Sequence, residues 1–192
     1  IVINPNPPSR FNIVAGGGTH LCGTMTDNRL YCWGETRNAT LYQPTWVHAL
    51  LDPVIAPSAT NYSICALTLN GVVKCSGWIS DWYLELTGED GKGTLWSGLD
   101  YMPVVGIQEE VRLIQGEQLT HCAVTVAGRL YCWGENSGGQ LGSGYADREL
   151  LPVLIPGLHQ SAHLSHGYDH ACAAGGGALL LVLHLGRLHR VV

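Results

Sequence analysis

Six of the seven cysteines in this 192-residue sequence fall into three pairs, and the members of each pair are ten residues apart. The pairs are Cys22 with Cys32, Cys65 with Cys75, and Cys122 with Cys132. Thiols in this arrangement can form disulfides, stay reduced in a core, or hold a metal ion. The seventh cysteine, Cys172, has Val182 ten residues further on and therefore lacks a partner of this kind.

The residues between the paired cysteines favour disulfides. A three-residue hairpin loop centred between two such cysteines places them directly opposite each other on neighbouring strands, and it needs a residue that tolerates positive φ at its third position. The residues there are Asn28, Gly71 and Gly128. Directly opposed strand residues lie roughly 4.5–5.5 Å apart at Cα, which suits a disulfide. Reduced buried thiols are the first alternative. A zinc site is the second, but it usually uses closer C-x2-C pairs.

Histidines offer a second kind of chemistry. Four of them follow a spacing that one face of a helix would bring together as metal ligands: His159, His163, His166 and His170. The segment around His170 matches the segment around His20, where we expect strands. In a strand, residues with this spacing point to both faces, so the four imidazoles would not come together. We therefore expect no metal site there. His121 could act as a base for the neighbouring Cys122, but a disulfide would disable that nucleophile.

No other catalytic or cofactor-binding pattern is present. The sequence contains no H-E-x-x-H, G-x-S-x-G, Walker or EF-hand motif. The glycine-rich segment 139–144 leads into a bend rather than into a helix that could cradle a phosphate. We therefore predict a protein that is not an enzyme and that binds no metal and no cofactor.

The elements that must position the cysteines recur along the chain. The leading cysteines Cys22, Cys65, Cys122 and Cys172 are 43, 57 and 50 residues apart. A period of this size predicts one supersecondary unit per repeat, as in propellers and solenoids. We place the four repeats at 1–45, 46–103, 104–153 and 154–192 within a single domain, the last repeat being degenerate.

The third copy, GEQLTHCAVTVAGRLYCWGENSGGQLG at 116–142, resembles the regulator of chromosome condensation repeat. That family shows G-x-x-H-x-C-A-L, a turn, and then V-x-C-W-G-x-N-x-x-G-Q-L-G. The third copy carries most of the second half as Cys132, Trp133, Gly134, Asn136, Gly139, Gln140, Leu141 and Gly142. The other copies are worn: the first replaces the G-Q pair with Ala39-Thr40, the second has Ser76 in place of tryptophan, and the fourth departs after Ala173.

This resemblance implies an all-β propeller of four-stranded blades, usually seven in number. Paired cysteines indicate the secreted relatives of the family rather than its nuclear members. Four hairpins make at most four blades, whereas a propeller hides its sheet edges by closing into a ring. We therefore expect further sequence of the same polypeptide, or other protein chains, to complete the ring.

Composition and sequons bear on partners and location. The net charge is −5 and the sequence has no basic run, which argues against nucleic-acid binding. The apolar run at 179–183 is too short to span a membrane. N-glycosylation sequons begin at Asn38 and Asn61. Together with the cysteine pairs they favour an extracellular or cell-surface protein, and the first residue, Ile1, suggests a processed end or a fragment.

An aromatic-rich insertion follows the second hairpin. Its aromatic residues are Trp78, Trp82, Tyr83, Trp96 and Tyr101. Exposed aromatic loops are frequent binding surfaces, and the alternative is that these rings pack between blades. We consider them candidates for a ligand surface.

These observations together predict a non-enzymatic, secreted β-propeller that serves as an interaction or structural module, within a larger glycoprotein assembly. The first alternative is a carbohydrate-binding propeller that stacks sugars on the Trp78–Trp96 aromatics. The second is a protein inhibitor of an enzyme, as some secreted relatives are.

Overall fold

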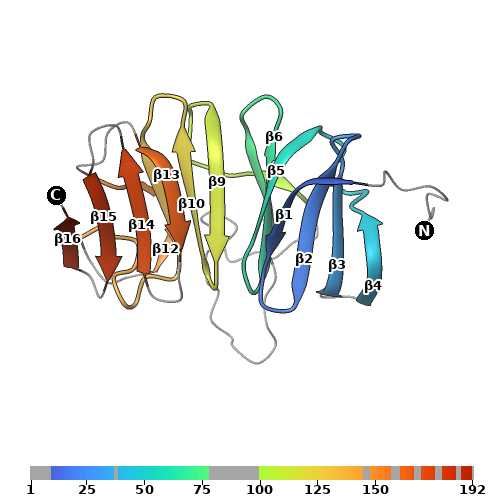
Figure 1. Cartoon of the computed structure of the whole chain (residues 1–192), viewed down its shortest axis with the longest axis horizontal. Coiled ribbons are helices and arrows are strands. Elements are labelled where there is room, and N and C mark those ends of the chain that lie inside the picture. Colours follow the sequence, from blue (N-terminus) through green and yellow to red (C-terminus); the bar gives the residue numbers. More distant parts are fainter. Residues whose placement is uncertain are drawn as a thin grey trace.

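The computed structural model describes residues 10–36, 39–77, 100–144, 148–156, 161–166, 170–175, 179–184 and 187–191. All regular secondary structure among these residues is β-strand. The strands form four antiparallel sheets of four strands each (Figure 1). Within each sheet, strands that follow each other in the chain are hydrogen-bonded neighbours. The predicted all-β fold class is confirmed.

The four sheets, here called blades 1 to 4, follow the chain. Blade 1 contains β1 (Phe11–Gly16), β2 (His20–Met25), β3 (Leu30–Thr36) and β4 (Ala39–Trp46). Blade 2 contains β5 (Val54–Ala59), β6 (Ser63–Thr68), β7 (Val73–Gly77) and β8 (Met102–Pro103). Blade 3 contains β9 (Val111–Glu117), β10 (Thr120–Thr125), β11 (Leu130–Gly134) and β12 (Glu149–Leu154). Blade 4 contains β13 (Ser161–His166), β14 (His170–Gly175), β15 (Leu179–His184) and β16 (Arg187–Val191). The limits of the repeats at 1–45, 46–103, 104–153 and 154–192 stay a proposal.

The central hairpin of each of the first three blades has the expected register. Cys22 is paired with Cys32, Cys65 with Cys75, and Cys122 with Cys132. The third loop residue has positive φ in each hairpin: 56° at Asn28, 75° at Gly71 and 79° at Gly128. Asparagine and glycine accept this conformation with little strain, so the local sequence fixes which residues face each other.

The core repeats from blade to blade. Each pair of cysteines lies on one face of its sheet, and this face packs against the next blade. The contact there is an alanine, the residue that follows the leading cysteine of the next blade. These alanines are Ala66 in blade 2, Ala123 in blade 3 and Ala173 in blade 4. We call the face that carries the cysteines the bridge face and the opposite one, which carries the alanine, the leading face. The sheets therefore stack bridge face to leading face, as propeller blades do.

Backbone hydrogen bonds join consecutive blades at one end of the stack. The amide of Val54 donates to the carbonyl of Asn28 at 2.7 Å, and that of Val111 donates to Gly71 at 2.9 Å. In each case the acceptor belongs to the hairpin loop of one blade and the donor begins the first strand of the next. The same loop residues that set the cysteine register thus also attach the following blade.

Candidate functional site

The paired thiols are closed as disulfides. Cys22–Cys32, Cys65–Cys75 and Cys122–Cys132 are bonded, each with Cα atoms 4.1 Å apart. All six residues are buried, so the three bridges lie inside the stack of blades. In the chain-entropy model, each closed loop of this length contributes about 3 kcal/mol of stability. Cys172 is the free cysteine of the described residues; it is half-buried and stands opposite Val182 in the sheet.

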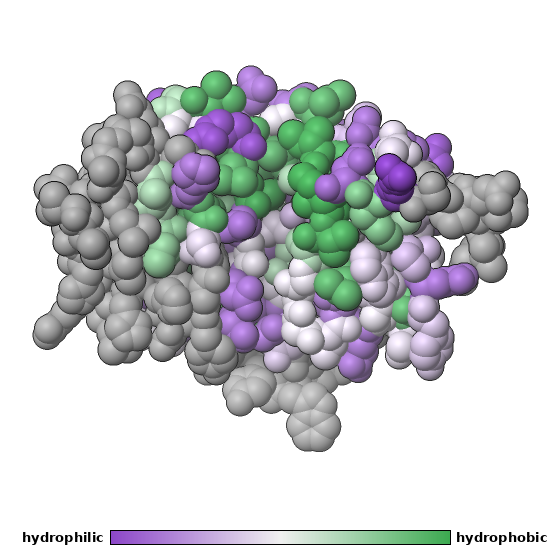
Figure 2. Space-filling model, in the orientation of Figure 1, coloured by the Kyte–Doolittle hydropathy of each residue, from purple (hydrophilic) through white to green (hydrophobic). Residues whose placement is uncertain are grey.

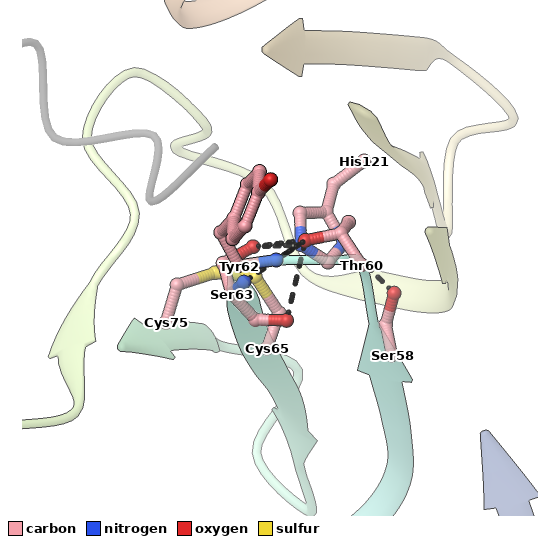
Figure 3. Close-up of a disulfide and its surroundings, with 7 residues drawn as sticks. All are labelled: Ser58, Thr60, Tyr62, Ser63, Cys65, Cys75 and His121. Atoms are coloured by element: carbon pink, nitrogen blue, oxygen red, sulfur yellow. Dashed lines mark hydrogen bonds between the residues drawn. A yellow bond between two sulfur atoms is a disulfide. The ribbon is translucent and has the colours of Figure 1, made fainter. Parts of the chain in front are cut away.

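A buried histidine connects blade 3 to blade 2 (Figure 3). The Nδ1 atom of His121 lies 2.8 Å from Ser58 Oγ, and its Nε2 atom lies 2.7 Å from Ser63 Oγ. Ser63 Oγ also lies 2.8 Å from Thr60 Oγ1. His121 is on β10 and the hydroxyls come from β5, β6 and the turn between them, so this network ties two neighbouring sheets together.

A serine hydroxyl beside an imidazole is the arrangement of a nucleophile and its base, but the burial of His121 indicates a different role. The ring is fully buried and stacks on Trp133, with ring centroids 5.7 Å apart. Hydroxyls occupy both ring nitrogens, and a substrate has no direct access to either serine. Cys122, which the sequence places beside this base, is held in a disulfide. The arrangement therefore satisfies buried polar groups and fixes the relative position of two blades.

Gly116 provides the space for this ring. It is the cross-strand neighbour of His121 on β9, and a Cβ atom there would lie 2.4 Å from Nδ1 of His121. The equivalent residue of blade 2 is Ala59, whose cross-strand neighbour is Ile64 rather than a histidine. Sequence reasoning missed the network because Ser58 and His121 are 63 residues apart. The glycine opposite the histidine was the one available signal.

His20 lies two residues before its leading cysteine, at the position that Ser63 and Thr120 occupy in the next two blades. Burial lowers the pKa of His20, an effect that a hydrogen bond to the Ser63 backbone opposes. That hydrogen bond agrees with the structural role expected for this residue. Of the four spaced histidines, His163 and His166 lie on β13 and His170 lies on β14, not on a helix. Within the described residues no three metal-binding side chains come together.

One of the five candidate ligand-surface residues, Tyr101, lies within the described residues. Trp78, Trp82, Tyr83 and Trp96 lie outside the described residues. The fifth candidate, Tyr101, packs against the core cluster that surrounds the disulfide of blade 1, and burial raises the pKa of its hydroxyl. For Tyr101 the structure therefore favours the packing role over the binding role.

One of the two sequon asparagines, Asn61, lies within the described residues. Asn38 lies outside the described residues. Asn61 lies in the turn between β5 and β6, and its Nδ2, the atom that would carry a glycan, donates to Gln118 Oε1 at 2.9 Å. The third residue of the sequon, Ser63, is buried against His121. Glycosylation at both sites stays a prediction, and at Asn61 it would replace an existing contact between blades 2 and 3.

Comparison with known proteins identifies the repeat. The family model for the regulator of chromosome condensation (RCC1) repeat matches residues 127–174, which begin in the hairpin loop of blade 3 and end in β14 of blade 4. This segment is therefore similar to an RCC1 repeat. It is 27% identical over 190 residues to the RCC1 domain-containing protein RUG3, mitochondrial, of Arabidopsis thaliana, and the match covers 88% of this chain and 41% of that protein.

Solved structures of other proteins share the fold. Human WBSCR16 superposes with a TM-score of 0.78 at 14% identity, covering 95% of this chain and 54% of the other. Yeast RCC1 (Prp20), solved bound to Kap60, superposes with a TM-score of 0.76 at 17% identity. The match covers 93% of this chain and 48% of the yeast chain. The CRINKLY ectodomain of the Arabidopsis thaliana receptor kinase ACR4 gives 0.57 at 16% identity, covering 91% and 53%.

The chain is therefore an RCC1-like β-propeller domain, as the motif of the third copy predicts. It spans about half the length of these solved structures and less than half of RUG3.

Proposed function

We propose that this chain is a non-enzymatic, extracellular propeller segment that works as a protein-interaction module within a larger glycoprotein assembly. The observation that carries the proposal is the open leading face of blade 1. Val14 and Leu21 on this face are 47% and 41% exposed, whereas the equivalent Ile114 and His121 of blade 3 are 3% and 0% exposed. In blade 3 the preceding blade covers these positions. The open face is therefore shaped for another protein segment.

The segment that would cover this face is a further blade, from the same polypeptide or from another chain. The leading faces of blades 2, 3 and 4 each meet the bridge face of the preceding blade. We therefore expect the leading face of blade 1 to be covered by a bridge face of the same kind. The chain matches about half of each of two solved structures with the same fold, so a further blade beside blade 1 would agree with their greater length.

Three buried disulfides support the extracellular location. Disulfides persist in oxidising compartments and are rare in the cytosol and nucleus, and the chain has three among its described residues. One structural neighbour is the ectodomain of a plant receptor kinase. None of the described residues forms a helix with the length and apolarity needed to cross a bilayer.

A role in protein binding, rather than in catalysis or nucleic-acid binding, is supported by charge and by the closed chemistry of the site. The chain has ten basic and fifteen acidic residues, and nucleic-acid binding depends on neutralising phosphates with positive charge. Both serine–histidine contacts of His121 are buried away from solvent. The neighbouring yeast RCC1 was solved bound to another protein, Kap60.

The test is whether the open face associates. The 192-residue chain would be produced through a secretory pathway, and its mass in solution measured by sedimentation velocity, alone and with any additional sequence of the same polypeptide. We expect association that Leu21→Asp abolishes and that Leu151→Asp, at a 42% exposed residue of blade 3, leaves unchanged. A chain that stays monomeric in all cases, or that is recovered with reduced thiols, would contradict the proposal.

A further inference from the structure

A small pocket opens between blades 2 and 3, at the end of the stack opposite the His121 network. It lies between the β6–β7 turn and the segment that joins β8 to β9, and its volume is about 250 Å³. Its walls include the aliphatic side chains of Val72, Val73, Val104 and Ile107. Two acidic residues, Glu109 and Glu110, stand at its edge.

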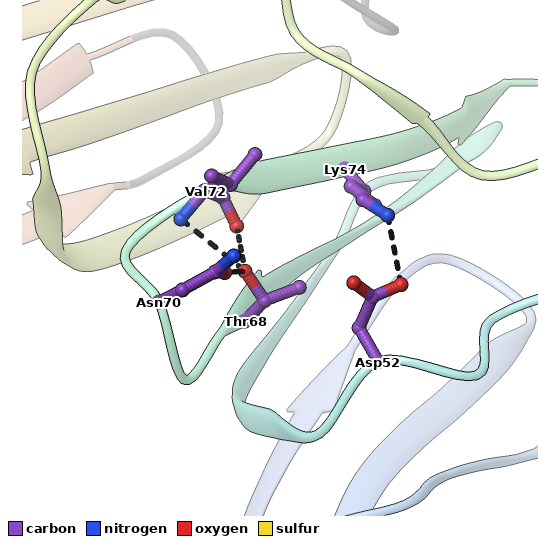
Figure 4. A network of polar contacts seen from close by, with 5 residues as sticks. All are labelled: Asp52, Thr68, Asn70, Val72 and Lys74. Atoms are coloured by element: carbon purple, nitrogen blue, oxygen red, sulfur yellow. Dashed lines mark hydrogen bonds and ion pairs between the residues drawn. The ribbon is translucent and has the colours of Figure 1, made fainter.

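The pocket is held in shape by hydrogen bonds on both sides. The hydroxyl of Thr68 lies 2.7 Å from the Val72 carbonyl and accepts from the Val72 amide at 3.2 Å, which fixes the turn (Figure 4). On the other side, the amide of Val104 donates to Val73 at 2.9 Å, and the amide of Val111 donates to Gly71 at 2.9 Å. Because its backbone is already ordered, the pocket can bind a ligand without a large entropic penalty.

Three exposed apolar residues adjoin residues that line the pocket. Leu69 and Val105 each stand next to a lining residue in the sequence, and the amide of Val126 donates to the carbonyl of Glu110. All three side chains are more than half exposed. Figure 2 shows hydrophobic residues gathering over the upper ends of β5, β6 and β9, where these turns lie. Apolar residues grouped around a concavity mark interaction sites more often than isolated ones do.

The two acidic residues differ in what they already bind. Glu109 lies 3.2 Å from Arg129 Nε and accepts from the hydroxyl of Tyr131 at 3.2 Å. Glu110 is exposed, and no described residue provides a hydrogen bond or ion pair to its carboxylate. Its aliphatic stem packs on Gly71, where a Cβ atom would lie 2.1 Å from Glu110 Cγ. An exposed carboxylate with no partner among the described residues therefore stands at the edge of an aliphatic pocket.

We infer that this pocket binds an extended peptide segment of a partner protein, with one aliphatic side chain in the pocket and an arginine or lysine beside it that pairs with Glu110. The volume is below the roughly 300 Å³ at which pockets for drug-sized ligands begin and suits a single aliphatic anchor. The charge of Glu110 and the net charge of −5 select a basic neighbour over an acidic one. This inference names a partner chemistry for the proposed interaction module and rests on that function.

The test uses synthetic peptides of about nine residues, built of glycine and serine. Each contains one leucine and one arginine, and the arginine follows the leucine by one, two or three positions. Binding to the isotope-labelled 192-residue chain would be followed by NMR. We expect at least one spacing to shift the amides of 70–73 and 104–111. Replacing its leucine by alanine should weaken binding at least tenfold.

Two variants locate the contact on the protein. Val72→Asp should abolish binding, while Leu151→Asp, at an exposed residue of β12, should leave it unchanged. Glu110→Lys should weaken binding of the arginine peptide about fivefold, the upper end for an exposed ion pair, and should improve binding of the same peptide with glutamate in place of arginine. Glu35→Lys, at an exposed residue of β3, is the charge control.

The outcomes separate this inference from the proposed function. If no peptide of the set binds, or if Val72→Asp binds as well as the natural chain, the pocket is not a peptide site, even when the open face of blade 1 associates as proposed. If the peptide binds in the pocket but blade 1 never associates, the peptide site stands and the ring-completing role of the module fails.

Discussion

Replacing Gly116 by alanine tests whether the His121 network holds blades 2 and 3 together. The added Cβ would lie 2.4 Å from His121 Nδ1 and 2.7 Å from Ser58 Oγ, closer than real Cβ contacts allow. Neither atom can retreat freely, because the ring is fully buried and its other nitrogen is bonded to Ser63. The imidazole must therefore shift and lose at least one of its hydrogen bonds.

The two effects set the magnitude. Forcing an extra methyl group into a packed interior costs about 1–3 kcal/mol, and leaving a buried polar group unpaired costs about 1–3 kcal/mol. We therefore expect Gly116→Ala to lower the free energy of unfolding by about 3 kcal/mol. The matched control is Gly16→Ala at the equivalent position of blade 1. A Cβ there would lie 3.2 Å from the Cδ2 atom of Leu21 on an open face, so the expected change is below about 1 kcal/mol.

Urea unfolding of the oxidised chain, followed by tryptophan fluorescence, measures both changes. A double-mutant cycle supplies the decisive comparison, because His121→Ala removes the ring that the new Cβ would strike. In that background Gly116→Ala should cost less than about 1 kcal/mol, giving a coupling of about 2 kcal/mol. Blade 2 supports this expectation, since it naturally has Ala59 opposite Ile64. Equal effects of Gly116→Ala in both backgrounds, or equal effects at Gly116 and Gly16, would refute the reasoning.

Three further predictions concern the disulfides, the pH dependence of stability and the sequons. Removing one bridge by Cys65→Ala with Cys75→Ala should lower stability by about 3 kcal/mol, and alkylation of the native, unreduced protein should modify no more than one thiol, as mass spectrometry would report. Burial lowers the pKa of His20 from 6.5, so the unfolded chain takes up a proton at a higher pH than the folded chain. Stability should therefore fall as the pH drops below about 6.5, and His20→Gln should make urea midpoints between pH 5 and 7.5 less pH-dependent. In protein from a secretory host, Asn61 should carry less glycan than Asn38, because its Nδ2 already donates to Gln118. Enzymatic deglycosylation in oxygen-18 water, followed by mass spectrometry, measures the occupancy of each site.

The register of the hairpins could be predicted from the sequence because it depends on neighbouring residues alone. The ten-residue cysteine spacing has one midpoint, and the residue after that midpoint has to tolerate positive φ. Asn28 and Gly71 do so, and their neighbours on both strands then follow by counting. The same local logic gives the all-β fold, since three copies of one hairpin with one cysteine spacing leave little choice of element type.

The contacts between blades could not be predicted in this way. The partner of His121 depends on which face of β10 meets blade 2, and on the turn that brings Ser58 and Ser63 to the same ring. The repeat is also degenerate, which makes the contacts between blades harder to predict. The histidine expected two residues before the leading cysteine is Thr120 in blade 3, and His121 stands one residue later, on the opposite face of the strand. Thr120 and His121 are neighbours in the sequence, but they face different blades, and the motif alone does not tell them apart.

The open face of blade 1 also differs from its counterparts in a way that bears on its partner. The position after the leading cysteine is alanine in blades 2 to 4 but Gly23 in blade 1, and the ring of Phe11 lies where its Cβ would be, with Phe11 Cδ1 2.5 Å away. The same ring contacts Trp33 at a centroid distance of 5.1 Å. A blade that docks here therefore meets an aromatic ring where the other blades present a methyl group to a disulfide, and its bridge face must leave more space than those of blades 1 to 3. Phe11→Ala should accordingly weaken the association of this face, while Leu151→Ala in blade 3 does not. If Phe11→Ala instead strengthens association, Phe11 shields the face and the partner binds only after the ring moves aside.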